Sequence, residues 1–252
     1  AARIILSENR PFSMETAACD EEYEPSSEYD SSFALQIFAA REAVFKILAK
    51  ESLSIHEKLI VILDMGSKIQ QCINTDEYDN IKSVVNDYLK EGIAHTLDET
   101  RNLSDSGQFE DISLQQGIRQ ILYPYEEMEV LNPEWEVILK DIIDSLFEQM
   151  SDEEYNILNE EFGTYMVSRA YEYRQLLEYL VFRYFAKSIY DYDFLGKCQM
   201  LVTNFFVIRQ MDIIRWLDNH REYSFKDRMD VVHIFSRQVE YSEDEKKQIE
   251  RV

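Results

Sequence analysis

The amino-acid sequence predicts an all-α fold: a multi-helix domain of orthogonal or bundle-like type with no substantial sheet. Its 252 residues include only 6 glycines and 4 prolines, whereas a β-rich chain of this size needs many turns built from these two residues. Apolar residues instead recur with the 3.6-residue period of helices over long segments. Hydrophobic residues make up 45% of the chain, so the chain can bury a sizeable core.

The beginning of the chain is expected to differ from the rest. Residues 1–32 contain a short apolar stretch, Ala1–Leu6, which we interpret as the remnant of a helix, and the acidic segment Cys19–Tyr29, which we interpret as a linker. The helical domain is predicted to cover residues 33–252. Its first helix is expected from Phe33 to Lys50.

Capping signals predict where the next helices begin. Ser54 and Glu57 have the spacing of a capping box, in which the serine oxygen accepts from a backbone N–H and the glutamate reaches back. The helix that they open is expected to run to about Cys72. Asn74 or Thr75 is then expected to cap a third helix that reaches the high nineties.

Breaker residues and further caps place the remaining helices. Residues 100–109 are interpreted as a loop, and a helix from about Ile112 is expected to end before Pro124, because proline lacks the N–H that continues a helix. Pro133 suits the first turn of the following helix. Long helices are expected at residues 165–189 and 194–217. Further helices are predicted to start at the capping residues Ser151–Glu154, Ser224–Asp227 and Ser242–Glu245.

Charge divides the predicted domain into two halves. Residues 1–165 hold 35 acidic and 12 basic side chains, a sum of −23, and residues 166–252 hold 14 of each, a sum of zero. The acidic half is densest over Ile121–Tyr165. Two interpretations stay open: solvated helix faces, or a surface that attracts a cationic partner such as a lysine-bearing protein. The net charge argues against nucleic-acid binding, because phosphate recognition needs a cationic face.

Several other classes of site are also excluded. No two glycines lie closer than Gly107 and Gly117, so no glycine-rich loop is present to approach a phosphate. The longest uncharged run, Cys198–Ile208, is far too short to cross a bilayer. The three cysteines lie far apart in the sequence, which favours a reducing, cytoplasmic location over a disulfide framework.

The histidines give no metal site. His95 shares one helix face with Glu91 and Glu99, but this spacing arises readily in an acidic helix, and we interpret it as a surface stripe. Asp230 and His233, followed by Arg237, are spaced for local ion pairing on a helix.

The candidate site residues are charges on otherwise apolar helix faces. Glu178 falls in the apolar arc of its predicted helix, one turn after Arg174, and Arg209 and Asp212 fall in or beside the apolar arc of the next. A buried charge must be paired, so these residues form either a structural ion network or the lining of a cleft. Seven tyrosines between Tyr165 and Tyr192, among them Tyr179, either pack at helix interfaces or form an aromatic wall for an ammonium group.

Extended phrases of the chain resemble the C-terminal region of the flagellin lysine-N-methylase family. The resemblance is strongest over Glu178–Glu245, which includes LLEYLVFRYFAKSIYDYDFLGKCQMLVTNFFVIRQMDIIRWL and the closing SRQVEYS at Ser236–Ser242. Earlier patches are ARIIL at Ala2–Leu6 and LQIFAAREAVFKILAKESLSIHEKLIVILDMGSKIQ. The family's N-terminal part carries a cysteine cluster, thought to hold a metal or iron–sulfur centre. Cys19, Cys72 and Cys198 do not match that cluster, so this chain is expected to be the helical C-terminal part.

The resemblance implies a methyltransferase that moves a methyl group from S-adenosylmethionine to the ε-amine of lysines on flagellin or another lysine-bearing protein. The displacement needs a neutral amine, which a nearby carboxylate or tyrosine would help to prepare. Within this reading Glu178 is the predicted catalytic orienter or base, with Arg209, Asp212 and Tyr179 as substrate-binding residues. The alternatives are a non-catalytic helical module that binds a protein, or a scaffold for the N-terminal part.

Overall fold

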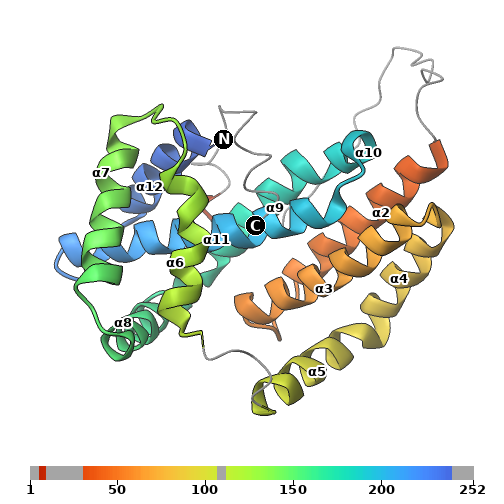
Figure 1. Cartoon of the computed structure of the whole chain (residues 1–252), viewed down its shortest axis with the longest axis horizontal. Coiled ribbons are helices and arrows are strands. Elements are labelled where there is room, and N and C mark those ends of the chain that lie inside the picture. The colour runs from red at the N-terminus through yellow and green to blue at the C-terminus, as the bar shows by residue number, and fades with distance from the viewer. Residues whose placement is uncertain (1–5, 10–30, 107–111, 240–252) are drawn as a thin grey trace. The chain divides into compact units, whose positions relative to one another are not determined.

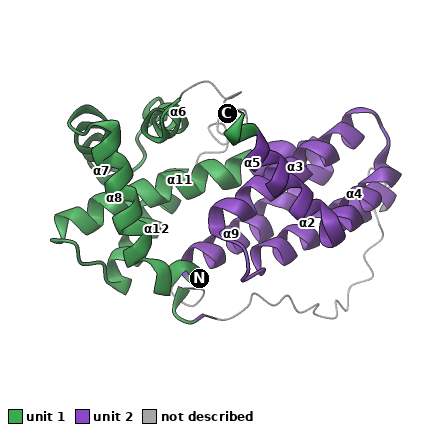
Figure 2. Cartoon of the chain, turned by 90° about the horizontal axis from the view of Figure 1, so that it is seen from below, with its two compact units in different colours: residues 1–8, 103–171, 199–252 green, residues 9–102, 172–198 purple. Residues whose placement is uncertain are grey.

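The computed structural model describes residues 6–9, 31–106 and 112–239, and within these ranges every regular element is helical and no strand occurs (Figure 1). The all-α prediction is therefore confirmed. The described chain divides into two compact units (Figure 2). Unit 1 comprises residues 1–8, 103–171 and 199–252, and unit 2 comprises residues 9–102 and 172–198. The charge boundary near residue 165 is not one of the positions at which the chain passes from one unit to the other. The predicted boundary at residue 32 lies next to residues outside the described ranges.

Unit 2 is built around three mutually packed helices, α2 (Ser31–Leu48), α3 (Ile55–Asn74) and α4 (Ile81–Asp87). Their apolar faces form its core, where Ile37, Val44 and Ile62 are fully buried. The chain then enters a π-helical segment, Tyr88–Gly92, and continues as α5 (Ile93–Asp105). Unit 2 also contains most of α9 (Ala170–Tyr184), the short α10 (Ser188–Asp191) and the first turn of α11 (Phe194–Asp218).

Unit 1 is organised around the rest of α11, whose buried polar side chains bond to the helices beside it. Tyr125 of α6 (Leu114–Glu126) donates to Asn204 at 2.8 Å, and Tyr155 of α8 (Asp152–Tyr165) donates to Gln210 at 2.9 Å. The other helices of the unit are α7 (Pro133–Ile142), which runs into a π-helical segment at Ile143–Glu148, and α12 (Phe225–Val239). α12 packs against α7.

The local capping predictions hold. Ser54 accepts from the backbone N–H of Glu57 at 3.2 Å, and the Glu57 carboxylate accepts from the backbone N–H of Ser54 at 2.8 Å. Ser151 and Glu154 make the same reciprocal bonds at the start of α8. Ser224 is confirmed as the start of α12, and Pro133 occupies the first turn of α7. The predicted start at Ser242 lies outside the described residues.

Other boundaries were wrong, and tertiary contacts or local geometry explain them. Thr75 ends α3 instead of starting a helix, because its hydroxyl donates back to the carbonyl oxygen of Gln71 at 3.0 Å. Pro124 lies inside α6, where the buried Tyr125 anchors the last turn. α5 continues to Asp105, through part of the expected loop.

The expected helix at residues 165–189 is not continuous. It is divided by 3₁₀ turns at Val167–Arg169 and Phe185–Lys187, on either side of α9. Such tight turns are common at helix ends.

Candidate functional site

Glu178 lies in a buried ion pair of unit 2. Its side chain is on α9 and the residue is 2% exposed. Glu178 Oε1 accepts from Arg174 Nη1 at 2.9 Å. This bond confirms that Glu178 pairs with the arginine one helical turn before it. Arg174 Nη2 donates in turn to Asn9 Oδ1 at 2.9 Å. The guanidinium therefore bridges the carboxylate to the segment at the start of unit 2.

The surroundings of Glu178 shift its proton affinity. Burial raises the pKa of the Glu178 carboxyl above its ordinary value, and the charges of Arg174 and Lys58 offset only part of the rise. Burial, followed by repulsion from Arg174, lowers the pKa of Lys58. Glu178 Oε2 has no hydrogen-bond partner among the described residues. The carboxyl can thus hold a proton at higher pH than an exposed glutamate, but it is enclosed by its own unit.

Asp212 lies in a second buried network, in unit 1. It is 0% exposed and accepts from the Tyr223 hydroxyl and from Arg228 Nη1, which is also fully buried. Arg209 does not share this ion pair. Its Nη2 donates to the carbonyl oxygen of Asn159 at 2.9 Å, and its guanidinium lies 5.2 Å from the centre of the Phe162 ring.

The four predicted site residues are divided between the two units. Glu178 and the half-buried Tyr179 belong to unit 2, whereas Arg209 and Asp212 belong to unit 1 and are bonded to different partners. Arg209 and Asp212 do not pair with each other: the cation that Asp212 contacts is Arg228, on α12. The catalytic and substrate-binding roles of these residues stay predictions.

Sequence reasoning missed an acidic pocket on unit 1, of about 280 Å³, between the end of α6 and α7 with its π-helical extension. We call it the acidic pocket. It is lined by Tyr125, Glu126, Met128, Val130, Trp135, Glu136, Leu139, Lys140, Ile143 and Asp144. The high density of acidic residues over Ile121–Tyr165 pointed to this region, but periodicity does not show which side chains surround a hollow.

The lining of the acidic pocket combines apolar and charged side chains. Tyr125 and Trp135 contribute buried rings whose centres lie 6.1 Å apart. Glu126 is paired with Arg119, and the second oxygen of its carboxylate lies 3.1 Å from Arg119 Nη2. Glu136 and Asp144 make no direct ion pair with a described residue. An apolar lining that also carries carboxylates suits a ligand that has an aliphatic stem and a cationic end.

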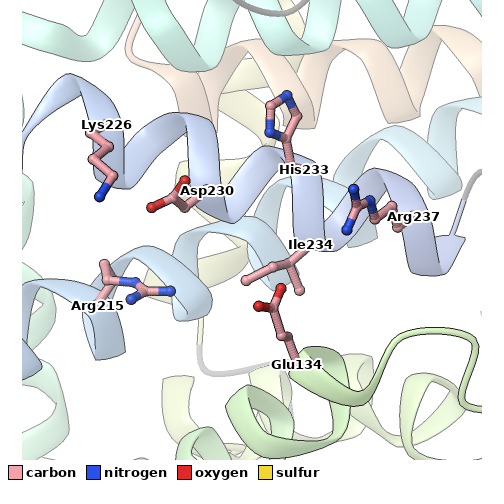
Figure 3. A pocket seen from close by; sticks show the side chains of 7 residues that line it. All are labelled: Glu134, Arg215, Lys226, Asp230, His233, Ile234 and Arg237. Carbon is pink, nitrogen blue, oxygen red and sulfur yellow. The ribbon is translucent and has the colours of Figure 1, made fainter.

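A second pocket of unit 1, of about 380 Å³, carries charges of both signs (Figure 3). We call it the mixed-charge pocket. Its lining residues are Glu134 from α7, Arg215 from α11, and Lys226, Asp230, His233, Ile234 and Arg237 from α12. The expected local ion pairing of Asp230, His233 and Arg237 is wrong: no direct ion pair joins these three described residues.

The structure bears on metal sites and membrane spans only for the described residues. No group of three or more His, Cys, Asp or Glu side chains there is arranged to hold a metal ion. His95 instead pairs with Glu99 at 3.2 Å on an exposed face of α5. No helix in the same ranges has the length and apolar character that a membrane span requires.

Comparison with known proteins gives one finding. Neither the search of curated proteins nor the search of solved structures produced a significant match. The scan against protein families matched residues 41–252 to the FliB lysine N-methylase C-terminal domain. This match covers α3 to α12 and the second part of α2, from Arg41 onward. The chain therefore belongs to the FliB lysine N-methylase C-terminal domain family.

Proposed function

We propose that this chain is the part of a protein-lysine methyltransferase that binds the substrate lysine, and that the acidic pocket is where the lysine side chain docks. The family match supports a lysine-bearing protein substrate, and flagellin is the substrate that we propose. The observation that carries the proposal is the acidic pocket itself, because its apolar lining and its two unpaired carboxylates complement the stem and the ammonium group of lysine.

The charges of the lining favour a lysine over other ligands. Arg119 compensates Glu126, so Glu136 and Asp144 are left opposite the single ammonium of Lys140, a net charge of −1. This potential attracts a cationic side chain and repels an acidic one. The same carboxylates stabilise the protonated amine, which is a poor nucleophile. The acidic pocket therefore serves to capture and orient lysine, and the proton must be removed elsewhere.

One of the two pockets does not suit S-adenosylmethionine. The mixed-charge pocket has no Trp, Tyr or Phe side chain to stack on an adenine ring, and its arginines repel a sulfonium cation. S-adenosylmethionine thus remains an implication of the family resemblance, as does an iron–sulfur or metal centre, and no step of the proposal passes through either group.

The proposal is tested by peptide binding. The chain is titrated with a short unstructured peptide that contains one lysine, and with the same peptide carrying N-acetyl-lysine, which keeps the stem and loses the charge. Glu136→Gln combined with Asp144→Asn is expected to weaken binding of the lysine peptide about 5- to 10-fold, since each exposed charge contact contributes up to about 1 kcal/mol. The acetylated peptide is expected to bind weakly to every variant.

The matched control removes the same charge away from the acidic pocket. Asp141→Asn combined with Glu160→Gln changes two exposed carboxylates of unit 1 that do not line it, and is expected to leave binding within twofold. Equal weakening by both double variants, or equal binding of the acetylated peptide, would contradict the proposal.

A methylation assay with the whole enzyme separates catalysis from simple binding. The pocket variant is expected to raise KM for the protein substrate with little change in kcat, because it alters capture of the lysine. Glu178→Gln addresses the predicted catalytic role: normal methylation by this variant would remove Glu178 from the mechanism. If the peptide binds as predicted but the intact enzyme does not methylate, the non-catalytic binding module is the better description.

A further inference from the structure

The mixed-charge pocket differs from the rest of the chain in the sign of its charge. Its lining contains Arg215, Lys226 and Arg237 against Glu134 and Asp230. Three cations and two carboxylates leave a net charge of +1 with the histidine neutral, on a chain whose net charge is −23. These residues come from α7, α11 and α12, so the cationic character is produced by the packing of three helices.

The charged groups around this pocket surround a hollow and do not neutralise one another. Among the described residues, no direct ion pair joins any two members of the lining. In Figure 3 the Arg215 guanidinium extends below Asp230, and the Arg237 guanidinium and the Glu134 carboxylate approach Ile234 from opposite sides. Opposite charges kept apart around a space of about 380 Å³ leave room for a ligand that contacts both kinds of group.

Arg215 provides independent evidence for a missing partner. Its Nε is buried and has no hydrogen-bond partner in the described structure, although the residue as a whole is only half-buried. A buried N–H without an acceptor is unfavourable, and guanidinium groups characteristically bind oxyanions through two parallel N–H donors. Because Nε itself is buried, an oxyanion in the pocket would bind Arg215 through the Nη donors of the guanidinium, which are not among the buried atoms and bond to no described residue.

The two carboxylates narrow the class of oxyanion. Asp230 and Glu134 can only accept hydrogen bonds when ionised, so they repel an anion that has no hydrogen to donate. Phosphate and phosphomonoesters near neutral pH retain a P–O–H group in part of the population, whereas sulfate has none. An anion with both acceptor oxygens and one O–H donor satisfies both parts of the lining.

We propose that the mixed-charge pocket binds a protonated oxyanion of the phosphate class. Arg215 holds it through its guanidinium, Lys226 and Arg237 add positive charge, and Asp230 or Glu134 accepts the P–O–H hydrogen. Inorganic phosphate and a small phosphomonoester share this chemistry. The proposal is independent of lysine binding at the acidic pocket, because Glu134 and the residues of α11 and α12 do not line that site.

The test measures anion binding to the whole chain at constant ionic strength, adjusted with sodium chloride. Inorganic phosphate is expected to bind at least 5-fold more tightly than sulfate, and Arg215→Gln is expected to weaken phosphate binding at least 10-fold. Arg221→Gln is the control, since Arg221 is an exposed arginine of the same unit that pairs with Glu161 outside the pocket. It is expected to change binding less than twofold. If Arg215→Gln fails to fold, the exposed Lys226→Gln replaces it, with a loss of at least 3-fold.

Asp230→Asn gives a second test, the preference for phosphate over sulfate, which a site that only attracts negative charge would not have. This variant is expected to bind sulfate better and to abolish the preference for phosphate. Methyl phosphate distinguishes the source of the ligand: tighter binding than inorganic phosphate indicates a phosphomonoester, and weaker binding indicates the free ion. The proposal is overturned if sulfate binds as well as phosphate to the unmodified chain, if Arg221→Gln weakens phosphate as much as Arg215→Gln, or if no phosphate binds at tens of millimolar.

Discussion

The buried ion pair of Asp212 and Arg228 gives a quantitative prediction for the stability of unit 1. Both side chains are 0% exposed, and the Asp212 carboxylate also accepts from the Tyr223 hydroxyl. Asp212→Asn removes the charge of this carboxylate from beside the buried Arg228 guanidinium. Breaking a buried pair by removing one partner destabilises a protein by about 3–5 kcal/mol. This is a large fraction of the about 5–15 kcal/mol that separates folded from unfolded domains.

The double variant decides whether this reasoning is right. Asp212→Asn combined with Arg228→Met removes both charges and replaces the guanidinium by an apolar side chain of similar length. We expect the double variant to be about 2–3 kcal/mol more stable than the sum of the two single effects predicts, because neither charge is then left alone.

Urea unfolding followed by tryptophan fluorescence is a suitable assay, because Trp135 and Trp216 both belong to unit 1. Glu161→Gln serves as the control: its pair with Arg221 is 43% and 56% exposed, and its loss is expected to cost about 0–1 kcal/mol. The reasoning fails if Asp212→Asn lies within 1 kcal/mol of the unmodified chain, or if the single effects simply add in the double variant.

Other predictions concern two helical glycines, one in each unit, and a capping box. Gly66→Ala is expected to destabilise by about 1–3 kcal/mol, because its added Cβ would lie 2.6 Å from the buried Cys198 Sγ; thermal unfolding measures this, and an unchanged midpoint would contradict it. Gly117→Ala, whose Cβ would meet nothing closer than 4.0 Å, is expected to stabilise α6 by about 0.5–1 kcal/mol in the same measurement. Bonds from the Ser54 backbone and side chain lower the pKa of Glu57 below its ordinary 4.5. Its carboxylate therefore adds stability above pH 4.5, which is lost as the pH falls through the lowered value. The stability difference between the unmodified chain and Glu57→Gln should shrink from pH 6 to pH 3 in urea titrations, and a constant difference would exclude this linkage.

The sequence predicted those features of the fold that depend on neighbouring residues. A capping box such as Ser54 with Glu57 requires only residues three positions apart, so both of its hydrogen bonds were predictable. The long apolar run of α11 predicted its bounds to within one residue, 194–217 against Phe194–Asp218.

Features that depend on distant residues were not predictable. The π-helical turn at Tyr88–Gly92 accompanies a contact in which the Tyr88 hydroxyl meets Asp64, a residue of another helix. Glu172 and Gln175 of α9 are polar residues that a sequence would place at the surface, yet they are 1% and 2% exposed because α9 is buried around most of its circumference. A helical wheel assumes one buried face and fails for such a helix.

The candidate site was predicted least well, for the same reason. Glu178 was correctly identified as a charge on an apolar face, and its partner Arg174 lies on the same helix. Arg228, the partner of Asp212, lies on a different helix, and no spacing along the sequence reveals it. The two pockets arise only when α7 meets its neighbours.

The interrupted course of the chain through the two units has a consequence for its biosynthesis. All of unit 2 has been translated once Cys198 has been added, whereas unit 1 still lacks most of α11 and all of α12. Unit 2 can therefore fold on the ribosome before α11, the helix around which unit 1 is organised, is available to the first segments of unit 1. Nascent chains arrested far enough beyond residue 198 for unit 2 to have left the ribosomal exit tunnel should resist protease within unit 2 and be cleaved within α6 to α8.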